Sequence, residues 1–482
     1  MKTRALILVI AAALLAGCGS SPISSSRLTW HSCDGRFKCA TLLVPVSYSH
    51  PQGEAIPLSL IELPASRPHP IADIVLNPGG PGGPGVQFLE QAWGDFPASL
   101  RARFTLVSFD PRGVGSSQPL QCLTPAGIEA NAALNPAPRT PKQIAAVVSG
   151  AKAFVHGCEQ NASTAFLSSM STANNARDMD RLRAALGQKQ LTYVGYSYGT
   201  YLGTVYAEMF PKHIRAMVFD GAVDTALDAE AAGSQQAAGF ETDLHDFFKW
   251  CGACLGDVSP AKPYAALFSR FERGHTIPAD LRPPLGATTV TYGVALRGVL
   301  AALYSKSTWP ILREALSSAQ GGDGSYLAAL AYSLSGLTDN GSFSNIVSAG
   351  FATSCLDSPA PRTIHRFERL AAQLSKSAPD FGAAEAWWGL PCLYWPIRSK
   401  AHAGAAHAPG APPILVVGST GDPATPYAWA QALARQLPRA TLLTRTGPGH
   451  TAYRSSSCIR RWVDRYLETL KMPSAGTVCP SD

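Results

Sequence analysis

One pentapeptide constrains the fold of this 482-residue chain more than any other segment. It reads G-Y-S-Y-G over residues 195–199, directly after an apolar run at residues 191–194 and before a helical pattern over residues 200–210. A serine held in a tight turn between a strand and a helix needs flanking glycines, because the backbone passes too close for side chains. The segment therefore predicts a strand, a sharp turn and a helix, with Ser197 exposed as a nucleophile.

Short apolar runs of this form occur at several places between residues 41 and 221, and Asn-Pro, Asp or Gly follows each of them. Such runs are typical of buried strands in a mainly parallel sheet with helices on both faces. They lie at residues 74–76, 104–109, 191–194 and 216–219. A helical pattern at residues 173–186 leads into the third of these strands. The polar residues that follow such strands are the places where α/β proteins carry their chemistry.

The pattern changes to helices between residues 226 and 400, with apolar spacing at 240–250, 292–304 and 311–319. An Ala-, Gly- and Pro-rich linker then leads back to two strands, at residues 414–417 and 440–443, and to a final helix at 459–470. We therefore expect a core made of residues 30–225 and 401–482. Residues 226–400 are expected to form an inserted, mostly helical lid domain.

Two further residues complete a catalytic set in the chain order Ser, Asp, His that is typical of the α/β-hydrolase fold. Asp422 follows the strand at 414–417, and His450 follows the strand at 440–443. A serine hydroxyl needs a histidine base, and the histidine needs a carboxylate that fixes its tautomer. We predict that Ser197, Asp422 and His450 form a triad. Considered singly, Asp422 could be a turn or helix cap, and His450 a loop histidine.

The tetrahedral intermediate of such a reaction needs two hydrogen-bond donors for its oxyanion. In this fold one is the backbone N–H after the nucleophile, here Tyr198, and the other belongs to a loop after an early strand. The Gly-rich segment N-P-G-G-P-G-G-P-G over residues 77–85 fits that loop, and Gly80 is the predicted donor. A phosphate-binding loop is the competing interpretation, but the segment has no Lys and its prolines remove N–H groups.

The N-terminus resembles a bacterial lipoprotein signal. Lys2 and Arg4 precede an apolar stretch at residues 5–15, which is too short to span a bilayer, and a Leu-Ala-Gly-Cys sequence ends at Cys18. Residues 1–17 are then a signal peptide, Cys18 is lipidated, and residues 18–29 form a flexible tether. The alternative is an ordinary secretory leader with a coincidental cysteine. Both interpretations predict an exported protein, and the first predicts a bacterial lipoprotein anchored to a membrane.

Charge and cysteine content agree with export. The net charge of +7 falls to +5 without Lys2 and Arg4, and the chain has no dense basic run, so nucleic-acid binding is not expected. Of 11 cysteines, lipidation of Cys18 would leave ten, an even number suited to disulfides in an oxidising compartment. Pairing by proximity predicts bridges 33–39, 122–158, 251–254, 355–392 and 458–479. Cys251 and Cys254 could instead be a redox pair or half of a zinc site, but no second close pair accompanies them.

Taken together, the motifs at residues 79–82, 110–117, 195–199 and 421–426 resemble the proline-iminopeptidase-like serine peptidases, above all the secreted tripeptidyl aminopeptidase branch. The resemblance covers nearly all of the chain after residue 30. It implies an α/β-hydrolase fold, a helical lid over the Ser197 cleft, and removal of residues from a peptide with a free N-terminus. Some relatives in this family act as esterases, so the fold and the triad transfer more safely than the substrate.

An aminopeptidase must bind the substrate ammonium, and a carboxylate from the lid is the simplest partner. Glu241, beside the apolar face of the helix at 240–250, and Asp357, near Cys355, are the candidates, although either could be a surface or capping residue. The expected chemistry needs no metal and no organic cofactor. The rival functions are a carboxylesterase with the same triad and a non-catalytic envelope lipoprotein. The sequence carries no signal for oligomeric state.

Overall fold

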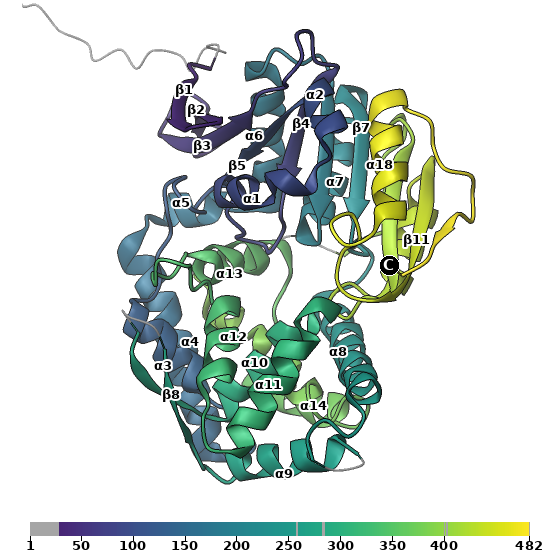
Figure 1. The fold of residues 1–482 in the computed structure, drawn as a ribbon. Coiled ribbons are helices and arrows are strands. Elements are labelled where there is room, and N and C mark those ends of the chain that lie inside the picture. The colour runs from purple at the N-terminus through teal and green to yellow at the C-terminus, as the bar shows by residue number, and fades with distance from the viewer. Residues whose placement is uncertain (1–27, 257–258, 282–284, 400, 402, 482) are drawn as a thin grey trace, which may run out of the picture.

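The computed structural model describes residues 28–256, 259–281, 285–399, 401 and 403–481 (Figure 1). The predicted signal peptide, Cys18 and most of the tether lie outside the described residues. A ten-stranded sheet forms the upper half of the molecule in Figure 1, and a helical unit forms the lower half. In the order of the sheet, the strands are β1 (His31–Asp34), β2 (Phe37–Pro45), β3 (Ala55–Leu63), β5 (Phe104–Phe109), β4 (Ala72–Asn77), β6 (Leu191–Tyr196), β7 (Ile214–Asp220), β10 (Ile414–Gly421), β11 (Ala440–Pro448) and β12 (Val478–Cys479).

The sheet is mainly parallel, as the sequence predicts. From β5 to β12 neighbouring strands are parallel, whereas β1, β2 and β3 form an antiparallel edge that pairs with β5. In β4, Val75 belongs to the apolar core on one face of the sheet, while Ile74 and Leu76 belong to the core on the other. Both faces of these strands are covered, which explains why they appear in the sequence as continuous apolar runs.

Helices cover both faces of the sheet. On one face lie α5 (Thr164–Ser169), α6 (Thr172–Ala185), α7 (Tyr198–Met209) and α17 (Tyr427–Gln436), and on the other α1 (Gly85–Ala92), α2 (Ala98–Arg103) and α18 (Ser457–Thr469). The strand order and the two helical layers are those of an α/β-hydrolase fold. The predicted fold class is confirmed.

The helical unit has an apolar core of its own. The helices of the unit are α8 (Ala229–Cys251), α9 (Ala261–Glu272), α10 (Tyr292–Leu303), α11 (Trp309–Gln320), α12 (Ser325–Leu334), α13 (Ile346–Asp357), α14 (Ile364–Leu374), α15 (Gly382–Trp388) and α16 (Leu390–Tyr394). The unit also contains a hairpin of β8 (Ile277–Asp280) and β9 (Ala287–Val290). Two earlier helices, α3 (Pro125–Ala133) and α4 (Pro141–Asn161), also place Ala132 and Ala151 in this core. The unit is thus built from two stretches of chain. Over the described residues, no helix is long and apolar enough to cross a membrane.

Disulfides tie together residues close in sequence. The described residues contain all five predicted bridges, which are Cys33–Cys39, Cys122–Cys158, Cys251–Cys254, Cys355–Cys392 and Cys458–Cys479. The pairing predicted from proximity is therefore confirmed. Cys251 and Cys254 form a bridge, in agreement with the interpretation that the sequence analysis favoured over a zinc site.

A fully buried ion pair fixes the loop after β5. The Arg112 guanidinium contacts both carboxylate oxygens of Asp178 in α6, at 2.5 and 2.7 Å, and donates to the backbone carbonyls of Pro45 and Val46. The Tyr48 hydroxyl donates to the same carboxylate at 2.6 Å. This network joins the edge hairpin, the loop and α6, so part of the 110–117 motif is structural.

We expect Asp178→Ala to lower the free energy of unfolding by about 3–5 kcal/mol, because it leaves the Arg112 charge buried without its partner. Urea titration of the purified variant measures the loss. Asp246→Ala is the matched control, since it breaks a surface ion pair with Lys249 and should cost less than about 1 kcal/mol. Equal losses in the two variants would contradict the structural role of the buried pair.

Candidate active site

Ser197 occupies a strained turn between β6 and α7. Its φ is +55° and its ψ −124°, and its backbone N–H donates to the Asp220 carbonyl at 2.9 Å. A Cβ at Gly195 would overlap the carbonyl of Gly199, and a Cβ at Gly199 would lie 2.8 Å from the Asn77 carbonyl oxygen. The close packing that the sequence analysis inferred from the two glycines is therefore present. Strain of this kind is typical of functional residues.

Asp422 and His450 lie in the loops that follow β10 and β11. The His450 Nδ1 is 2.9 Å from both carboxylate oxygens of Asp422. The same carboxylate accepts hydrogen bonds from the backbone N–H groups of Ala424 and Thr425 and from the Thr425 hydroxyl. These donors fix the carboxylate, which in turn orients the imidazole with Nε2 as the nitrogen that can accept a proton.

The charge of Asp422 also sets the protonation of the histidine. Burial alone would lower the pKa of His450, but the attraction and hydrogen bond of Asp422, with a smaller contribution from Asp220, raise it above 6.5. The surroundings of His450 therefore favour its protonated form. A general base needs this, because it must hold a proton during the reaction.

Asp220, at the end of β7, connects the serine turn with the histidine loop. Its carbonyl accepts the Ser197 N–H, and its buried carboxylate accepts the N–H groups of Ala452 and Tyr453, just after His450. A Cβ on the next residue, Gly221, would lie 3.1 Å from the His450 Cε1. Asp220 and Gly221 thus contact the serine turn on one side and the histidine loop on the other. Sequence reasoning missed Asp220, although an acidic residue that ends a predicted strand was a usable signal.

The Gly-rich loop after β4 lies directly against the serine turn. A Cβ at Gly79 would lie 3.1 Å from the Ser197 Cβ and 3.2 Å from the Tyr198 nitrogen. Tyr198 is the first residue of α7, so its N–H has no acceptor within the helix and lies at the positive end of the helix dipole. Gly80 is the next residue of the loop, with φ +113°. The two predicted oxyanion donors therefore belong to segments in contact with each other.

Comparisons with known proteins show which family the chain belongs to. The family model described as TAP-like protein matches residues 378–479. The Serine protease Hip1 of Mycobacterium tuberculosis H37Rv is 35% identical over 464 residues, covering 92% of this chain and 88% of the relative. The Tripeptidyl aminopeptidase of Streptomyces lividans is 31% identical over 488 residues, covering 96% and 88%. The chain belongs to the tripeptidyl aminopeptidase family.

Two further similarities complete these comparisons. Carboxylesterase B of Mycobacterium tuberculosis H37Rv is 33% identical over 480 residues, covering 95% of this chain and 91% of the relative. A crystal structure of Proline iminopeptidase from Mycobacterium smegmatis has a TM-score of 0.37 and 14% identity, covering 89% of this chain and 97% of that one. As a member of the tripeptidyl aminopeptidase family, the protein is a serine hydrolase.

In this family member, both predicted ammonium ligands are engaged in internal contacts. Glu241 is buried and accepts the backbone N–H of Asp380 at 3.1 Å; burial and the neighbouring Asp380 raise its pKa to about 7. Asp357 accepts the N–H of Thr172 at 3.0 Å and also its hydroxyl, which contacts the Tyr198 hydroxyl. Glu241 thus supports the start of α15, and Asp357 supports the residue after the nucleophile.

Another carboxyl of the helical unit, Glu385, acts electrostatically on Tyr304, the residue against His450. Glu385 in α15 is half-buried and forms no hydrogen bond with the described residues, and burial raises its pKa to about 7. Burial and the charges of Glu385 and Asp422 together raise the pKa of Tyr304, which places Tyr304 within the influence of both carboxylates. The Tyr304 ring packs on His450 at 5.6 Å between centroids, and its carbonyl accepts the His450 N–H at 2.8 Å. In the sequence, Glu385 appears only as a single acidic residue among alanines and tryptophans.

Proposed function

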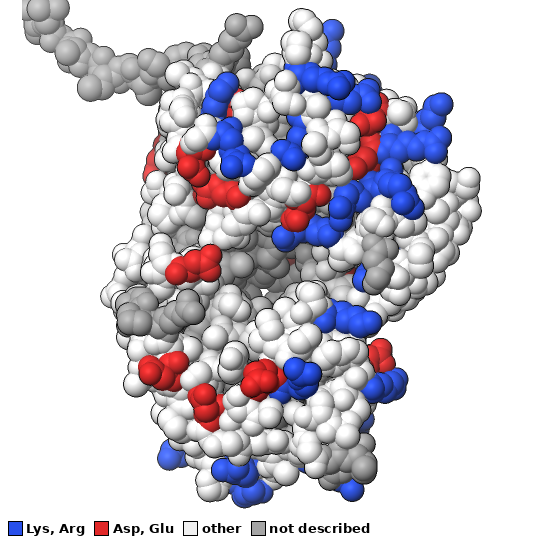
Figure 2. Space-filling view, in the orientation of Figure 1, with Lys and Arg blue, Asp and Glu red and all other residues white. Residues whose placement is uncertain are grey.

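We propose that the protein is a serine exopeptidase that hydrolyses peptide bonds near a free N-terminus through Ser197, Asp422 and His450. Two relatives are named for peptidase activity, which supports peptide substrates. The observation that carries the aminopeptidase specificity is Glu385, a half-buried carboxyl with no hydrogen bond among the described residues, whose charge acts on Tyr304, the residue against His450. Figure 2 shows a hollow between the sheet-bearing half and the helical half, on which such a substrate could lie.

In the proposed mechanism, the Ser197 oxygen attacks the scissile carbonyl carbon while Nε2 of His450 takes the hydroxyl proton. Asp422 stabilises the imidazolium through Nδ1, and the N–H groups of Gly80 and Tyr198 hold the oxyanion. The imidazolium then gives its proton to the leaving amine, and an acyl-enzyme remains. Water repeats the sequence with His450 as base, which releases the N-terminal fragment and restores Ser197.

Glu385 suits the ammonium group for two reasons. First, it lies on α15 of the proposed lid and packs closely against α8: a Cβ added to Gly233 would lie 3.2 Å from the Glu385 Oε1. Its carboxylate also has no positive partner among the described residues, so a substrate ammonium would supply one. A charge-assisted hydrogen bond in an enclosed site is worth more than one in water.

We expect Glu385→Gln to lower kcat/KM for peptides with a free amino group by about 10- to 100-fold, the value of one hydrogen bond to a charged group. N-acetylated peptides and simple acyl esters should lose less than about threefold. Glu314→Gln, an exposed glutamate on α11, is the matched control. If Glu241→Gln gave the selective loss and Glu385→Gln did not, the ammonium site would belong to Glu241.

An esterase is the second candidate, because Carboxylesterase B aligns over almost the whole chain. Comparing tripeptidyl amides with acyl esters on the same enzyme separates the two functions. A peptidase should show the larger kcat/KM on the free-amine amides, whereas greater activity on esters together with no effect of the free amine would favour the esterase.

We also propose that the protein is exported and anchored through Cys18. The five disulfides support an oxidising compartment. Fractionation of cells that express Cys18→Ser tests the anchor, since the variant should leave the membrane fraction; retention there would contradict it.

A further inference from the structure

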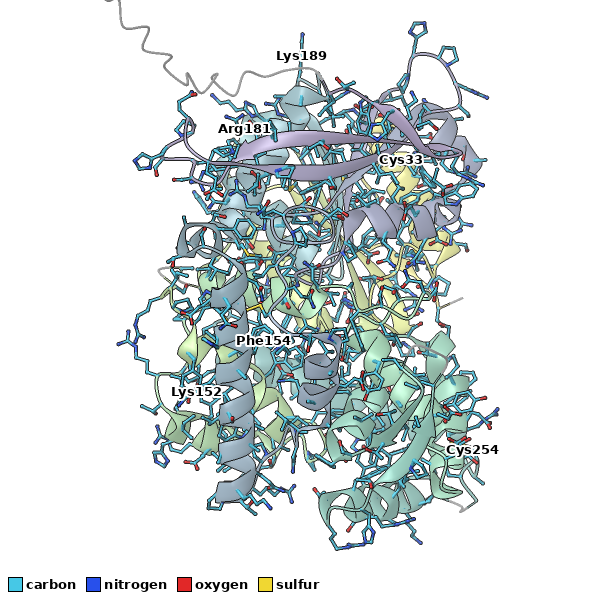
Figure 3. All side chains as sticks on the ribbon, turned by 90° about the vertical axis from the view of Figure 1, so that its left-hand side faces the viewer. Cys33, Lys152, Phe154, Arg181, Lys189 and Cys254 are labelled. Carbon is cyan, nitrogen blue, oxygen red and sulfur yellow. A yellow bond between two sulfur atoms is a disulfide. The ribbon has the colours of Figure 1, made fainter. Side chains whose placement is uncertain are left out.

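A second feature of the helical unit points to a ligand. A cavity of about 110 Å³ lies among α3, α4, α10, α13 and α15, and its walls are mainly apolar. One wall is an aromatic row in which Phe351 lies 5.4 Å from Phe154 and 5.4 Å from Trp388, between ring centroids. Figure 3 shows Phe154 on α4, the long helix that faces the viewer. Asn131 and Ser335 are the uncharged polar residues of the lining.

Arg297 is the only charged residue among those that line this cavity. Its guanidinium lies 5.7 Å from the centre of the Trp388 ring, and it forms no ion pair or hydrogen bond with any described residue. Burial lowers its pKa to about 10, so the side chain is still a cation at neutral pH. Arg297 as a whole is partly exposed, but its Nε is buried without a hydrogen-bond partner, and a guanidinium with no anion beside it favours a role in binding one.

Two helices carry both a residue that lines the cavity and a residue of the proposed substrate site. On α10, Arg297 precedes Tyr304, the residue against His450, by two turns, or about 10 Å of helix rise. On α15, Trp388 follows Glu385 by one turn. Three extended residues span about 10 Å. The rise between Arg297 and Tyr304 thus equals the length of an extended tripeptide.

We propose that Arg297 binds the side-chain carboxylate of an aspartate or glutamate near the N-terminus of the peptide substrate. This subsite rests on the proposed exopeptidase function. The fork of the guanidinium matches a carboxylate, and the apolar walls accept the methylene groups that carry it. The protein would therefore prefer acidic residues at one of the first positions of its substrates.

The test uses the full-length enzyme and free-amine tripeptidyl substrates that carry Glu or Gln at each of the three positions in turn. At one position, wild type should favour Glu over Gln by about tenfold or more in kcat/KM, as for a hydrogen bond between charged groups. Arg297→Met should bring this ratio close to one, and Arg297→Lys should keep part of it. Arg313→Met, which removes an exposed arginine from α11, should leave the ratio as in wild type.

Two results would overturn the subsite: a wild-type ratio near one at all three positions, or a preference for Glu that survives in Arg297→Met. The thermal midpoint adds a second measurement, because removing an unpaired buried charge should not lower it. If Arg297→Met failed to fold, the guanidinium would be structural and the subsite would be rejected. Absence of peptide hydrolysis by wild type, with ester hydrolysis intact, would instead be the failure of the exopeptidase function.

Discussion

Ser197→Ala is expected to lower kcat by about 10⁶-fold on peptide and ester substrates alike, the scale of loss when a triad nucleophile is removed. The reason is that no acyl-enzyme can form without the hydroxyl, although the oxyanion donors and the substrate contacts remain. KM should change little, because Ser197 contributes attack rather than ground-state binding. Steady-state kinetics on one tripeptidyl amide and one acyl ester measure both parameters.

Ser419→Ala is the matched control for this experiment. Ser419 is also buried near the end of a core strand, β10, and its hydroxyl has no hydrogen-bond partner among the described residues. Its loss should leave kcat within about twofold. A fluorophosphonate probe should label wild type and Ser419→Ala but not Ser197→Ala. Labelling of Ser197→Ala would mean that another residue is the nucleophile, whereas an unlabelled wild type would favour a non-catalytic lipoprotein.

The sheet could be predicted because burial on both faces leaves a strong local signal. The apolar run at residues 104–109 coincides with β5, and the run at 191–194 lies within β6. The positions of Ser197, Asp422 and His450 after core strands could be predicted for the same reason, because the end of each strand is visible in the sequence. The structure brings Asp422 and His450 together as that order requires.

The contacts within the helical unit could not be predicted, because they join residues far apart in the chain. Glu385 faces Gly233, and α3 joins the helical core from a position before the nucleophile. Glu241 was attractive for its place on an amphipathic helix, but periodicity does not reveal that the backbone N–H of Asp380 already occupies its carboxylate. Local patterns indicate which face of a helix is buried, and not which partner it meets.

Asp422→Asn is expected to lower kcat by about 10⁴-fold, because an amide at this position can hold His450 in the wrong tautomer. It should also change the pH dependence. His450 must be neutral to accept the Ser197 proton, so activity is lost as the pH falls through its pKa, which Asp422 raises above 6.5. The acid limb of kcat/KM for wild type should therefore have its midpoint above pH 6.5.

In Asp422→Asn the main raising charge is gone, whereas burial still lowers the pKa of His450, so the acid limb of the residual activity should move to lower pH. An acyl ester without ionisable groups is the proper substrate, since neither Glu385 nor a substrate amine then contributes to the profile. Asp73→Asn is the control. Asp73 lies at the start of β4, whereas the triad residues follow the ends of their strands, and its carboxylate accepts a hydrogen bond from Gln188. This variant should keep the wild-type limb. An unmoved limb in Asp422→Asn would mean that another group sets the protonation of the base, and Asp220, the second carboxylate that raises the His450 pKa, would be the next to test.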